Sequence, residues 1–278
     1  MPKIIDGKAL AEKIQADLTL EIKEKNLNPN LAVILIGDDP ASHLYVSLKK
    51  KACQKIGITF HEYLLDNDTS QEKVLATINF LNQDPKIDAI LIQLPLPPHL
   101  DTEKIISALD PDKDVDGFHP KNIEKLLKQE SDFIPGLPLG IIKLIESTEE
   151  NLAGKKAVII AKNEVLYRPL AKLLNDQQVT TAIISPQDTN IKNQTAQADI
   201  LIVACGKAFF ITADMIKEDA IVIDVGTNKI DNGHVVGDVD YSEVFDKVSH
   251  ITPVPGGVGP MTVAMLLYNT VKLAERNK

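Results

Sequence analysis

Short apolar runs alternate with amphipathic stretches through the first half of the chain. Residues 31–36 and 89–92 are uninterrupted apolar runs, typical of buried strands, and residues 58–65 alternate loosely between apolar and polar. Residues 6–25 and 70–82 repeat apolar positions at helical spacing, so we predict a helix over each. The residues on these helical faces are Leu10, Ile14, Leu18 and Ile22 in the first helix, and Val74, Ile78 and Leu81 in the second. Strands that alternate with helices predict βαβ units and a mainly parallel sheet.

The stretch between residues 38 and 53 carries the first candidate chemistry. Leu44, Leu48 and Ala52 recur at helical spacing, and we expect that face to point at a core. Tyr45 and Lys49 lie four residues apart, so they share a neighbouring face. A lysine that loses part of its hydration has a lower proton affinity and can serve as an acid or a base. The competing interpretation is a solvated helix surface, because runs of lysine usually mark exposed faces.

The second half of the chain repeats the alternation of strands and helices. The predicted strands are residues 156–161, 179–185, 200–204 and 220–225. Residues 133–140 indicate a proline-rich loop, and residues 141–150 and 262–276 indicate helices. This is the rhythm of a dinucleotide-binding unit, but the turn at residues 161–169 lacks the glycines that let a pyrophosphate approach the backbone. The glycine-rich residues 254–262 precede a helix, so they can hold an anion or a flat ring; the competing interpretation is a tight interdomain turn.

Composition narrows the class of protein. The 278 residues carry a formal net charge of −9, which argues against nucleic acid and anionic membranes as main partners. No stretch reaches the roughly 18 apolar residues that a membrane helix needs, and the N-terminus has no signal-peptide core. Cys53 and Cys205 lie in apolar segments without metal-binding spacing. We therefore expect buried thiols in a reducing compartment, no metal site and a cytoplasmic protein.

Several sequence blocks together resemble the FolD family of bifunctional methylenetetrahydrofolate dehydrogenases/methenyltetrahydrofolate cyclohydrolases. The blocks are Asp39-Pro40-Ala41-Ser42 with Tyr45-Val46 and Lys49, then Gln93-Leu94-Pro95-Leu96-Pro97, Lys113-Asp114-Val115-Asp116-Gly117, Asp224-Val225-Gly226, Gly237-Asp238-Val239 and Thr252-Pro253-Val254-Pro255-Gly256-Gly257-Val258-Gly259-Pro260-Met261-Thr262. They stand in the family's order, and the resemblance covers nearly the whole chain.

This resemblance implies two α/β domains that flank a cleft, the C-terminal one Rossmann-like, with the last helix returning to the N-terminal domain. It places a catalytic, folate-binding domain at residues 1–118 plus 258–278 and a dinucleotide-binding domain at residues 119–257. It also implies a homodimer that oxidises 5,10-methylenetetrahydrofolate with NADP and hydrolyses the methenyl product to 10-formyltetrahydrofolate. Tetrahydrofolate derivatives are thus the expected partners and NADP the expected cofactor.

The residues that act on folate in the family are intact in this sequence. The resemblance implies that Lys49 assists proton movement as water adds to the methenyl carbon, and that Gln93 hydrogen-bonds Lys49. It implies that Tyr45 stacks on or orients the folate ring. Asp116 is expected to accept paired N–H groups of the pterin, a geometry that suits a carboxylate. The other expected site residues are Pro255, Gly256 and Gly257 beside the pterin, and Ala161, Lys162, Asn163, Ser185 and Thr227 at the cofactor.

The departures from the family pattern cluster on the cofactor side. The family's Gly-Arg-Ser phosphate turn is Ala161-Lys162-Asn163 here, and a later glycine position holds the bulky Tyr167. The other altered segments are Pro135-Gly136-Leu137-Pro138 for Pro-Cys-Thr-Pro, Ile184-Ser185-Pro186 for a Cys-His-Ser-like segment, and Gly226-Thr227-Asn228 for Gly-Ile-Asn.

The sequence leaves several functions open. The favoured one is a bifunctional enzyme in which Lys162 meets a 2′-phosphate and Asn163 lies near the pyrophosphate. A cyclohydrolase that binds NADP poorly or not at all needs only Lys49 and its neighbours. A non-catalytic folate-binding paralogue has no need of intact Lys49, Gln93 and Asp116, and a generic Rossmann dehydrogenase is disfavoured by the missing glycine fingerprint.

Overall fold

The structure, a computed structural model, describes residues 3–230 and 233–277. Within these ranges the chain forms two compact units. One, the six-stranded unit, consists of the residues up to Ala11 together with Leu137–Thr262. The other, the three-stranded unit, consists of Glu12–Gly136 together with the residues from Val263 onward. Each unit is built on a parallel sheet, so the predicted class of two α/β domains is confirmed.

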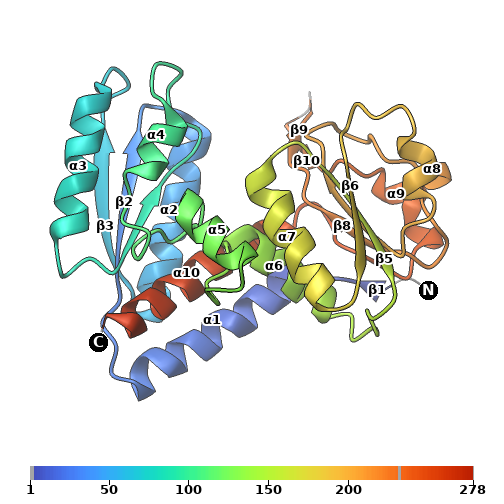
Figure 1. The fold of residues 1–278 in the computed structure, drawn as a ribbon, viewed down its shortest axis with the longest axis horizontal. Coiled ribbons are helices and arrows are strands. Elements are labelled where there is room, and N and C mark those ends of the chain that lie inside the picture. The colour runs from blue at the N-terminus through green and yellow to red at the C-terminus, as the bar shows by residue number, and fades with distance from the viewer. Residues whose placement is uncertain (1–2, 231–232, 278) are drawn as a thin grey trace. The chain divides into compact units, whose positions relative to one another are not determined.

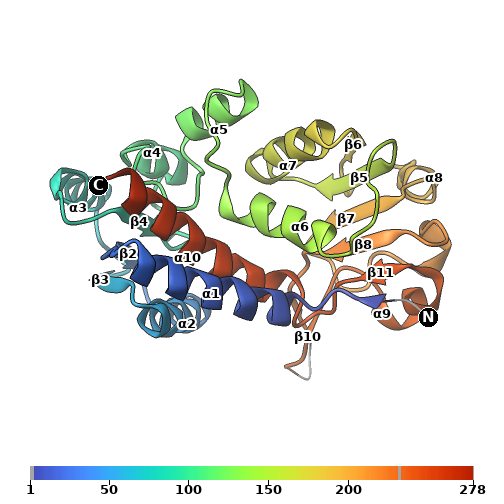
Figure 2. The same ribbon diagram turned by 90° about the horizontal axis from the view of Figure 1, so that it is seen from below.

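The three-stranded unit has the strand order β3-β2-β4, and both strand pairs are parallel (Figures 1 and 2). Its strands are β2 (Asn30–Ile36), β3 (Thr59–Leu65) and β4 (Ala89–Ile92), all of which the sequence predicted. Successive side chains of a strand point to opposite faces. The odd-numbered residues of β2 therefore enter one hydrophobic core, and the even-numbered residues enter a second core on the other face.

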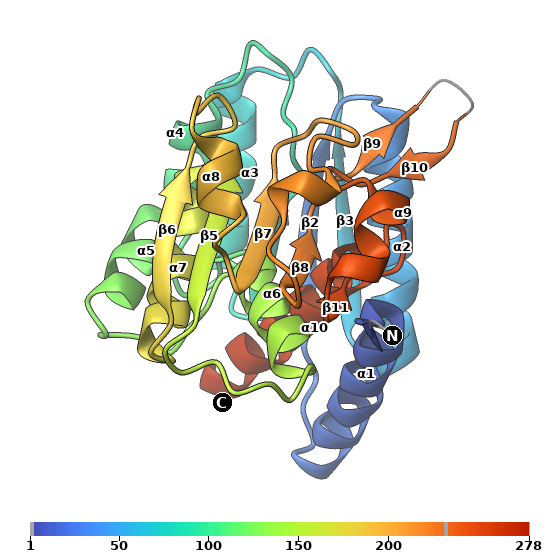
Figure 3. The ribbon, with the colours of Figure 1, turned by 90° about the vertical axis from the view of Figure 1, so that its right-hand side faces the viewer.

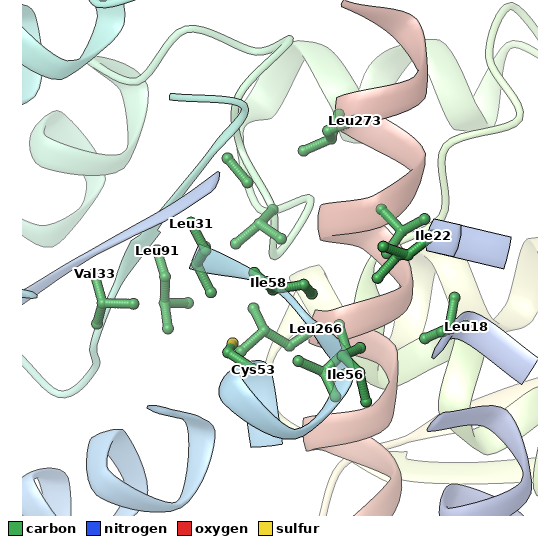
Figure 4. Close-up of a cluster of buried hydrophobic side chains, with 14 of the residues drawn as sticks. Leu18, Ile22, Leu31, Val33, Cys53, Ile56, Ile58, Leu91, Leu266 and Leu273 are labelled. Carbon is green, nitrogen blue, oxygen red and sulfur yellow. The ribbon is translucent and has the colours of Figure 1, made fainter. Parts of the chain in front are cut away.

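Helices cover both faces of this sheet. The elements on the first face are α1 (Gly7–Glu24), α2 (Pro40–Ile56) and α10 (Val258–Arg276), and those on the second are α3 (Gln71–Gln83) and α4 (Thr102–Ser107). Figure 4 shows Leu266 and Leu273 of α10 in the same cluster as Leu18 of α1 and Leu31 of β2. Helices α1 and α10 lie side by side (Figures 1 and 2). The last helix thus packs in the N-terminal half, as predicted.

Helix α2 does not bury the face that its apolar spacing predicted. Leu44 is 59% exposed and Leu48 is 45% exposed. The buried residues of α2 are Ser42, Val46, Cys53 and Ile56. Lys49 follows Val46 by three residues and precedes Cys53 by four, so it lies on the buried face. The prediction was wrong because helical spacing alone does not say which of two neighbouring apolar faces meets the sheet.

The six-stranded unit has the strand order β1-β11-β8-β7-β5-β6, and every pair is parallel (Figure 3). Its strands are β1 (Lys3–Ile4), β5 (Lys156–Ala161), β6 (Thr180–Ile184), β7 (Ile200–Ala204), β8 (Ile221–Asp224) and β11 (His250–Ile251). The sequence predicted all except β1 and β11, which at two residues each are too short for a periodic signal. The Rossmann-like character of this unit is confirmed.

Helices also cover both faces of the six-stranded sheet. In Figure 1, α6 and α7 lie on one side of it, and α8 and α9 on the other. Their bounds are α6 (Gly136–Glu146), α7 (Glu164–Asp176), α8 (Ile191–Thr195) and α9 (Tyr241–Val244). Helix α6 begins five residues before the predicted 141–150 and includes part of the expected loop 133–140. Pro138 sits in the first turn, where its missing N–H has no helical partner to lose.

The remaining elements are short. They are α5 (Pro120–Leu127), the 3₁₀ turns η1 (Ala213–Met215) and η2 (Phe245–Lys247), and the antiparallel pair β9 (Asn228–Lys229) and β10 (Val235–Val236). Among the helices of the described residues, none is both long enough and apolar enough to cross a membrane.

Candidate active site

Lys49 and Gln93 form a direct hydrogen bond in the three-stranded unit. The Lys49 Nζ donates to Gln93 Oε1 at 2.9 Å. Gln93 is the first residue after β4, and its backbone N–H donates to Ile34 O of β2 at 3.0 Å. Its side-chain Nε2 donates to Leu94 O at 2.7 Å. Because both the backbone and the amide nitrogen of Gln93 are held, its carbonyl oxygen is fixed toward the lysine.

Asp116 emerges at the same end of the sheet as Gln93. The segment before it runs parallel to β4: Ile90 N donates to Lys113 O at 2.7 Å, and Val115 N donates to Ile90 O at 3.4 Å. Residues that follow parallel neighbouring strands meet at the carboxyl edge of the sheet. The topology therefore brings together two candidate residues that are far apart in the sequence.

The charges of Lys49 and Asp116 act on one another. Burial lowers the pKa of Lys49, and the negative charge of Asp116 opposes this shift. Burial raises the pKa of Asp116 to about 6, and Lys49 opposes that shift in turn. The pKa values of both groups are thus shifted toward neutral pH. A side chain exchanges protons most readily when its pKa lies near the pH of the solution. The arrangement is suited to proton transfer beside a held carboxylate.

Two polar residues hold the loop that carries Asp116. The sequence analysis gave neither of them a role. Asp114, 1% exposed, accepts hydrogen bonds from Gly117 N at 3.1 Å, His119 N at 2.8 Å and the Asn122 side chain at 3.1 Å. Asn269 of α10 donates to the carbonyl oxygen of Val115 at 2.9 Å. The residues on either side of Asp116 are therefore fixed. An amide in the apolar face of the final helix was the signal that could have identified Asn269.

The other predicted folate-side residues have different surroundings. Tyr45 lies one turn before Lys49 on α2 and is 46% exposed. Pro255, Gly256 and Gly257 belong to the six-stranded unit, where the loop packs on the start of α1. Lys8 N donates to Gly256 O at 3.0 Å, and a Cβ added at Gly7 would meet Gly257 O at 1.9 Å. The tight-turn role of this loop is thus evident in the structure.

The predicted cofactor residues all follow strands of the six-stranded sheet. Ala161 ends β5, and Lys162 and Asn163 form the turn into α7. Ser185 follows β6, and Thr227 lies three residues after β8. Since these strands are parallel, the residues line one carboxyl edge, where open α/β sheets bind ligands. Lys162 is exposed there, at the N-terminal end of a 13-residue helix.

Comparisons with known proteins agree with this arrangement. Residues 5–116 match the tetrahydrofolate dehydrogenase/cyclohydrolase catalytic domain, and residues 135–278 match the NAD(P)-binding domain of the same family. A Sulfurovum sp. protein described as bifunctional protein FolD is 47% identical over 278 residues, covering 99% of both chains. The crystal structure of FolD from Campylobacter jejuni has a TM-score of 0.96 at 45% identity and covers 100% of both chains.

A more distant structure extends the comparison. The Trypanosoma brucei methylenetetrahydrofolate dehydrogenase-cyclohydrolase, solved with NADP and an inhibitor, has a TM-score of 0.94 at 32% identity and covers 99% of this chain and 98% of that one. Together the matches define a two-part protein with a catalytic and an NAD(P)-binding portion. The chain belongs to the tetrahydrofolate dehydrogenase/cyclohydrolase family, which confirms the resemblance found in its sequence blocks.

Proposed function

We propose that this chain oxidises 5,10-methylenetetrahydrofolate with NADP and hydrolyses the resulting 5,10-methenyltetrahydrofolate to 10-formyltetrahydrofolate. The observation that carries the proposal is the hydrogen bond between Lys49 and Gln93, with the carboxylate of Asp116 acting electrostatically on the same lysine. The family resemblance implies that these three residues act on the folate, and all of them lie in one unit of the fold.

Lys49 handles protons in the hydrolytic step. Water adds to the electrophilic methenyl carbon, a carbon–nitrogen bond of the ring breaks, and one proton is released overall. A lysine whose pKa is lowered by burial has a larger neutral fraction, so it can take a proton from the attacking water and return one to the departing nitrogen. Gln93 holds the ammonium end of Lys49 in place through their 2.9 Å hydrogen bond.

Asp116 and Tyr45 place the substrate. The ionised Asp116 carboxylate accepts two N–H groups of the pterin, and the exposed ring of Tyr45 stacks on or orients the folate. Pro255, Gly256 and Gly257 border the pterin in this proposal. Their loop is held at Gly256 by the hydrogen bond from Lys8.

The residues of the six-stranded sheet edge fit a dinucleotide. NADP, when bound, accepts a hydride from the methylene carbon of the folate. Lys162 meets the 2′-phosphate, and Asn163 lies near the pyrophosphate at the start of α7. Ala161, Ser185 and Thr227 complete the proposed set along the edge.

A cyclohydrolase without the dehydrogenase activity is the second candidate. It is favoured by the turn before α7, where the Asn163 side chain accepts the Val165 N–H at 3.0 Å and so occupies a donor that a phosphate would use. Tyr167, at a glycine position of the family, lies in the same first helical turn and interacts with Glu164. These two features weaken the dinucleotide site without touching Lys49.

One experiment separates the two functions. The purified protein is titrated with NADP and with NAD by calorimetry, and both activities are then followed spectrophotometrically. Binding and turnover with NADP support the bifunctional proposal. Hydrolysis without dinucleotide binding supports the second candidate. We expect Lys49→Ala to abolish hydrolysis while NADP affinity stays unchanged, because Lys49 lies in the other unit. Full hydrolysis in Lys49→Ala would contradict the assigned role.

We also propose that the chain works as a homodimer. Leu44 and Leu48 of α2 and Leu64 of β3 are each at least 45% exposed, and α2 contacts β3. Exposed leucines beside the unpaired edge of β3 are a surface that a second copy would cover. Sedimentation equilibrium tests this, and a monomer at micromolar concentration would contradict it.

The functional domain limits and the compartment also belong to the proposal. The domains are proposed at residues 1–118 plus 258–278 and at residues 119–257, and limited proteolysis tests these limits. We propose a cytoplasmic location, which is consistent with Cys53 and Cys205 being buried and free. Fractionation of cells that make the protein tests the location.

A further inference from the structure

Two buried carboxylates of the six-stranded unit have no part in the proposed mechanism. Asp224, the last residue of β8, is 3% exposed, and Asp238 is 0% exposed. A buried charge destabilises a fold unless hydrogen bonds compensate its lost hydration. The partners of these two side chains therefore show what the charges are used for.

Asp238 binds two loops at the carboxyl edge of the sheet. Its carboxylate accepts the backbone N–H groups of Cys205 at 2.5 Å, Gly206 at 2.9 Å and Lys207 at 2.9 Å, all in the loop after β7. It also accepts the side-chain N–H of Asn228, after β8, at 2.8 Å. One side chain thus fixes the loops that follow two adjacent strands.

Asp224 anchors the backbone on which Asp238 is carried. Its carboxylate accepts Gly226 N at 2.9 Å, Asp238 N at 3.0 Å and Val239 N at 2.9 Å. The backbone that carries Asp238 is therefore anchored to the end of β8. The two aspartates form a continuous chain of hydrogen bonds across three segments of the edge.

Two glycines allow this close approach. A Cβ added at Gly226 would lie 2.4 Å from the carboxyl carbon of Asp238, and one at Gly237 would lie 1.8 Å from Oδ2 of Asp224. No larger residue fits at either position without displacing a carboxylate. The absence of a side chain at Gly226 and Gly237 is therefore what lets the backbone approach the carboxylates of Asp238 and Asp224.

The segments held by Asp224 and Asp238 include Thr227, a proposed cofactor residue. Thr227 lies between Gly226, whose N–H is held by Asp224, and Asn228, whose side chain is held by Asp238. Lys207, in the other held loop, is exposed and stacks its Nζ over the Phe210 ring at 4.9 Å from the ring centre. Both loops follow strands at the edge where the dinucleotide is proposed to bind.

We propose that Asp238, supported by Asp224, is a positioning residue of the dinucleotide site, which holds the loops after β7 and β8 in the shape that binds NADP. The proposal rests on the NADP-dependent dehydrogenase activity proposed above. Neither aspartate touches the cofactor in this proposal. Their effect passes through the backbone of residues 205–207 and through Asn228.

The test compares two variants with the unmutated protein. Asp238→Asn keeps the size of the side chain but turns an N–H₂ group toward backbone N–H donors, so the loops lose their shared acceptor. Asn228→Ala removes one donor and leaves the three backbone hydrogen bonds to Asp238. We expect NADP to bind about tenfold more weakly in each, as for the loss of one hydrogen bond to a charged group.

The readouts separate positioning from general destabilisation. KM for NADP is expected to rise in both variants, while hydrolysis of methenyltetrahydrofolate, catalysed in the other unit, stays within about twofold. Asp199→Asn is the matched control. Asp199 also accepts a backbone N–H, from Lys156 at 2.8 Å, but it precedes β7 at the opposite end of the sheet. We expect that variant to melt earlier with unchanged NADP affinity.

Four outcomes would overturn the proposal. Unchanged NADP affinity in Asn228→Ala and Asp238→Asn would remove the positioning role while leaving the dehydrogenase function intact. Equal loss of NADP affinity in Asp199→Asn, or parallel loss of hydrolysis, would show general unfolding instead. Absence of NADP binding in the unmutated protein would refute the dehydrogenase proposal, and the positioning role with it. If Asp238→Asn does not fold, Asn228→Ala decides.

Discussion

At the scale of single residues, the ionisation of Asp116 affects binding and stability in opposite directions. Burial raises its pKa to about 6 from a model-compound value of 3.8. Above that pH the carboxylate is ionised and can accept pterin N–H groups, so we expect folate affinity to rise as pH increases through about 6. Asp116→Asn is expected to remove this dependence and most of the affinity. Calorimetric titration with a non-reacting folate between about pH 5 and 8 measures both effects.

The same variant should stabilise the unliganded protein. The folded state binds the Asp116 proton more tightly than the unfolded state, so this group lowers stability as pH rises from about 4 to 6 and keeps it lowered above. We expect Asp116→Asn to gain about 3 kcal/mol at pH 8, from a shift of roughly two pKa units. Asp112→Asn is the control, because Asp112 is exposed in the same loop, and it should change neither the folate affinity nor the stability. A loss of stability in Asp116→Asn would contradict the assigned burial cost.

The site residues were predictable from sequence only where they carry a motif. Lys49, Gln93 and Asp116 stand in recognisable blocks, and the structure joins the first two by a hydrogen bond. Asn269 was missed because its partner, Val115 O, lies 154 positions earlier in the chain. Asp114 stands in the same sequence block as Asp116, but no local pattern assigns it a role. Long-range hydrogen bonds to backbone groups leave no local pattern in a sequence.

At the scale of elements, helix α1 is joined to α10 by a ring of charges. Glu21 of α1 accepts Lys25 at 2.6 Å and Lys272 of α10 at 2.6 Å, and Lys272 also meets Glu275 at 3.0 Å. Although burial acts to raise the pKa of Glu21, the hydrogen bonds from the two lysines lower it to about 2. The ring therefore contributes stability above the unfolded-state pKa near 4.5 and loses it as pH falls toward 2.

Glu21→Gln should reveal this contribution. We expect a loss of about 1 kcal/mol at pH 7, the upper range for a partly exposed ion pair, and a smaller difference as the pH falls below about 4. Urea unfolding at pH 7 and at a pH below about 4 measures the difference in stability. Glu24→Gln, an exposed residue of the same helix, is the matched control with no expected effect. A difference that does not shrink in acid would argue that packing, not charge, is responsible.

Element positions followed well from periodicity, but the buried face of α2 and the short strands did not. The faces of α1 and α3 were predicted because each has one apolar stripe. Helix α2 has two neighbouring stripes, and burial of Val46 and Cys53 rather than Leu44 and Leu48 is decided by its contact with the sheet. Strands β1 and β11 are two residues long and are defined by tertiary pairing, because β1 pairs with β11 and β11 pairs in turn with β8. Such tertiary choices cannot be derived from local spacing.

At the scale of the whole molecule, each unit is assembled from distant parts of the chain. Leu267 of α10 is 0% exposed and shares a core with Leu31 and Val33 of β2. We expect Leu267→Ala to lower the free energy of unfolding by about 3 kcal/mol, the cost of a cavity in a packed core. Urea unfolding measures the change. Leu20→Ala, at a residue 57% exposed, should cost little, and a similar loss in both variants would contradict the argument.

The interleaving of the two units affects how the protein is made. Lys3 and Ile4 leave the ribosome long before their strand partners His250 and Ile251 are made. The core around Leu31 likewise waits for α10, which begins more than 200 residues later at Val258. Neither unit can therefore close during most of translation. A nascent chain halted after β8 but before β11 exposes two unfinished apolar surfaces at once, and we expect chaperones or proteases to intercept it before either unit has become native.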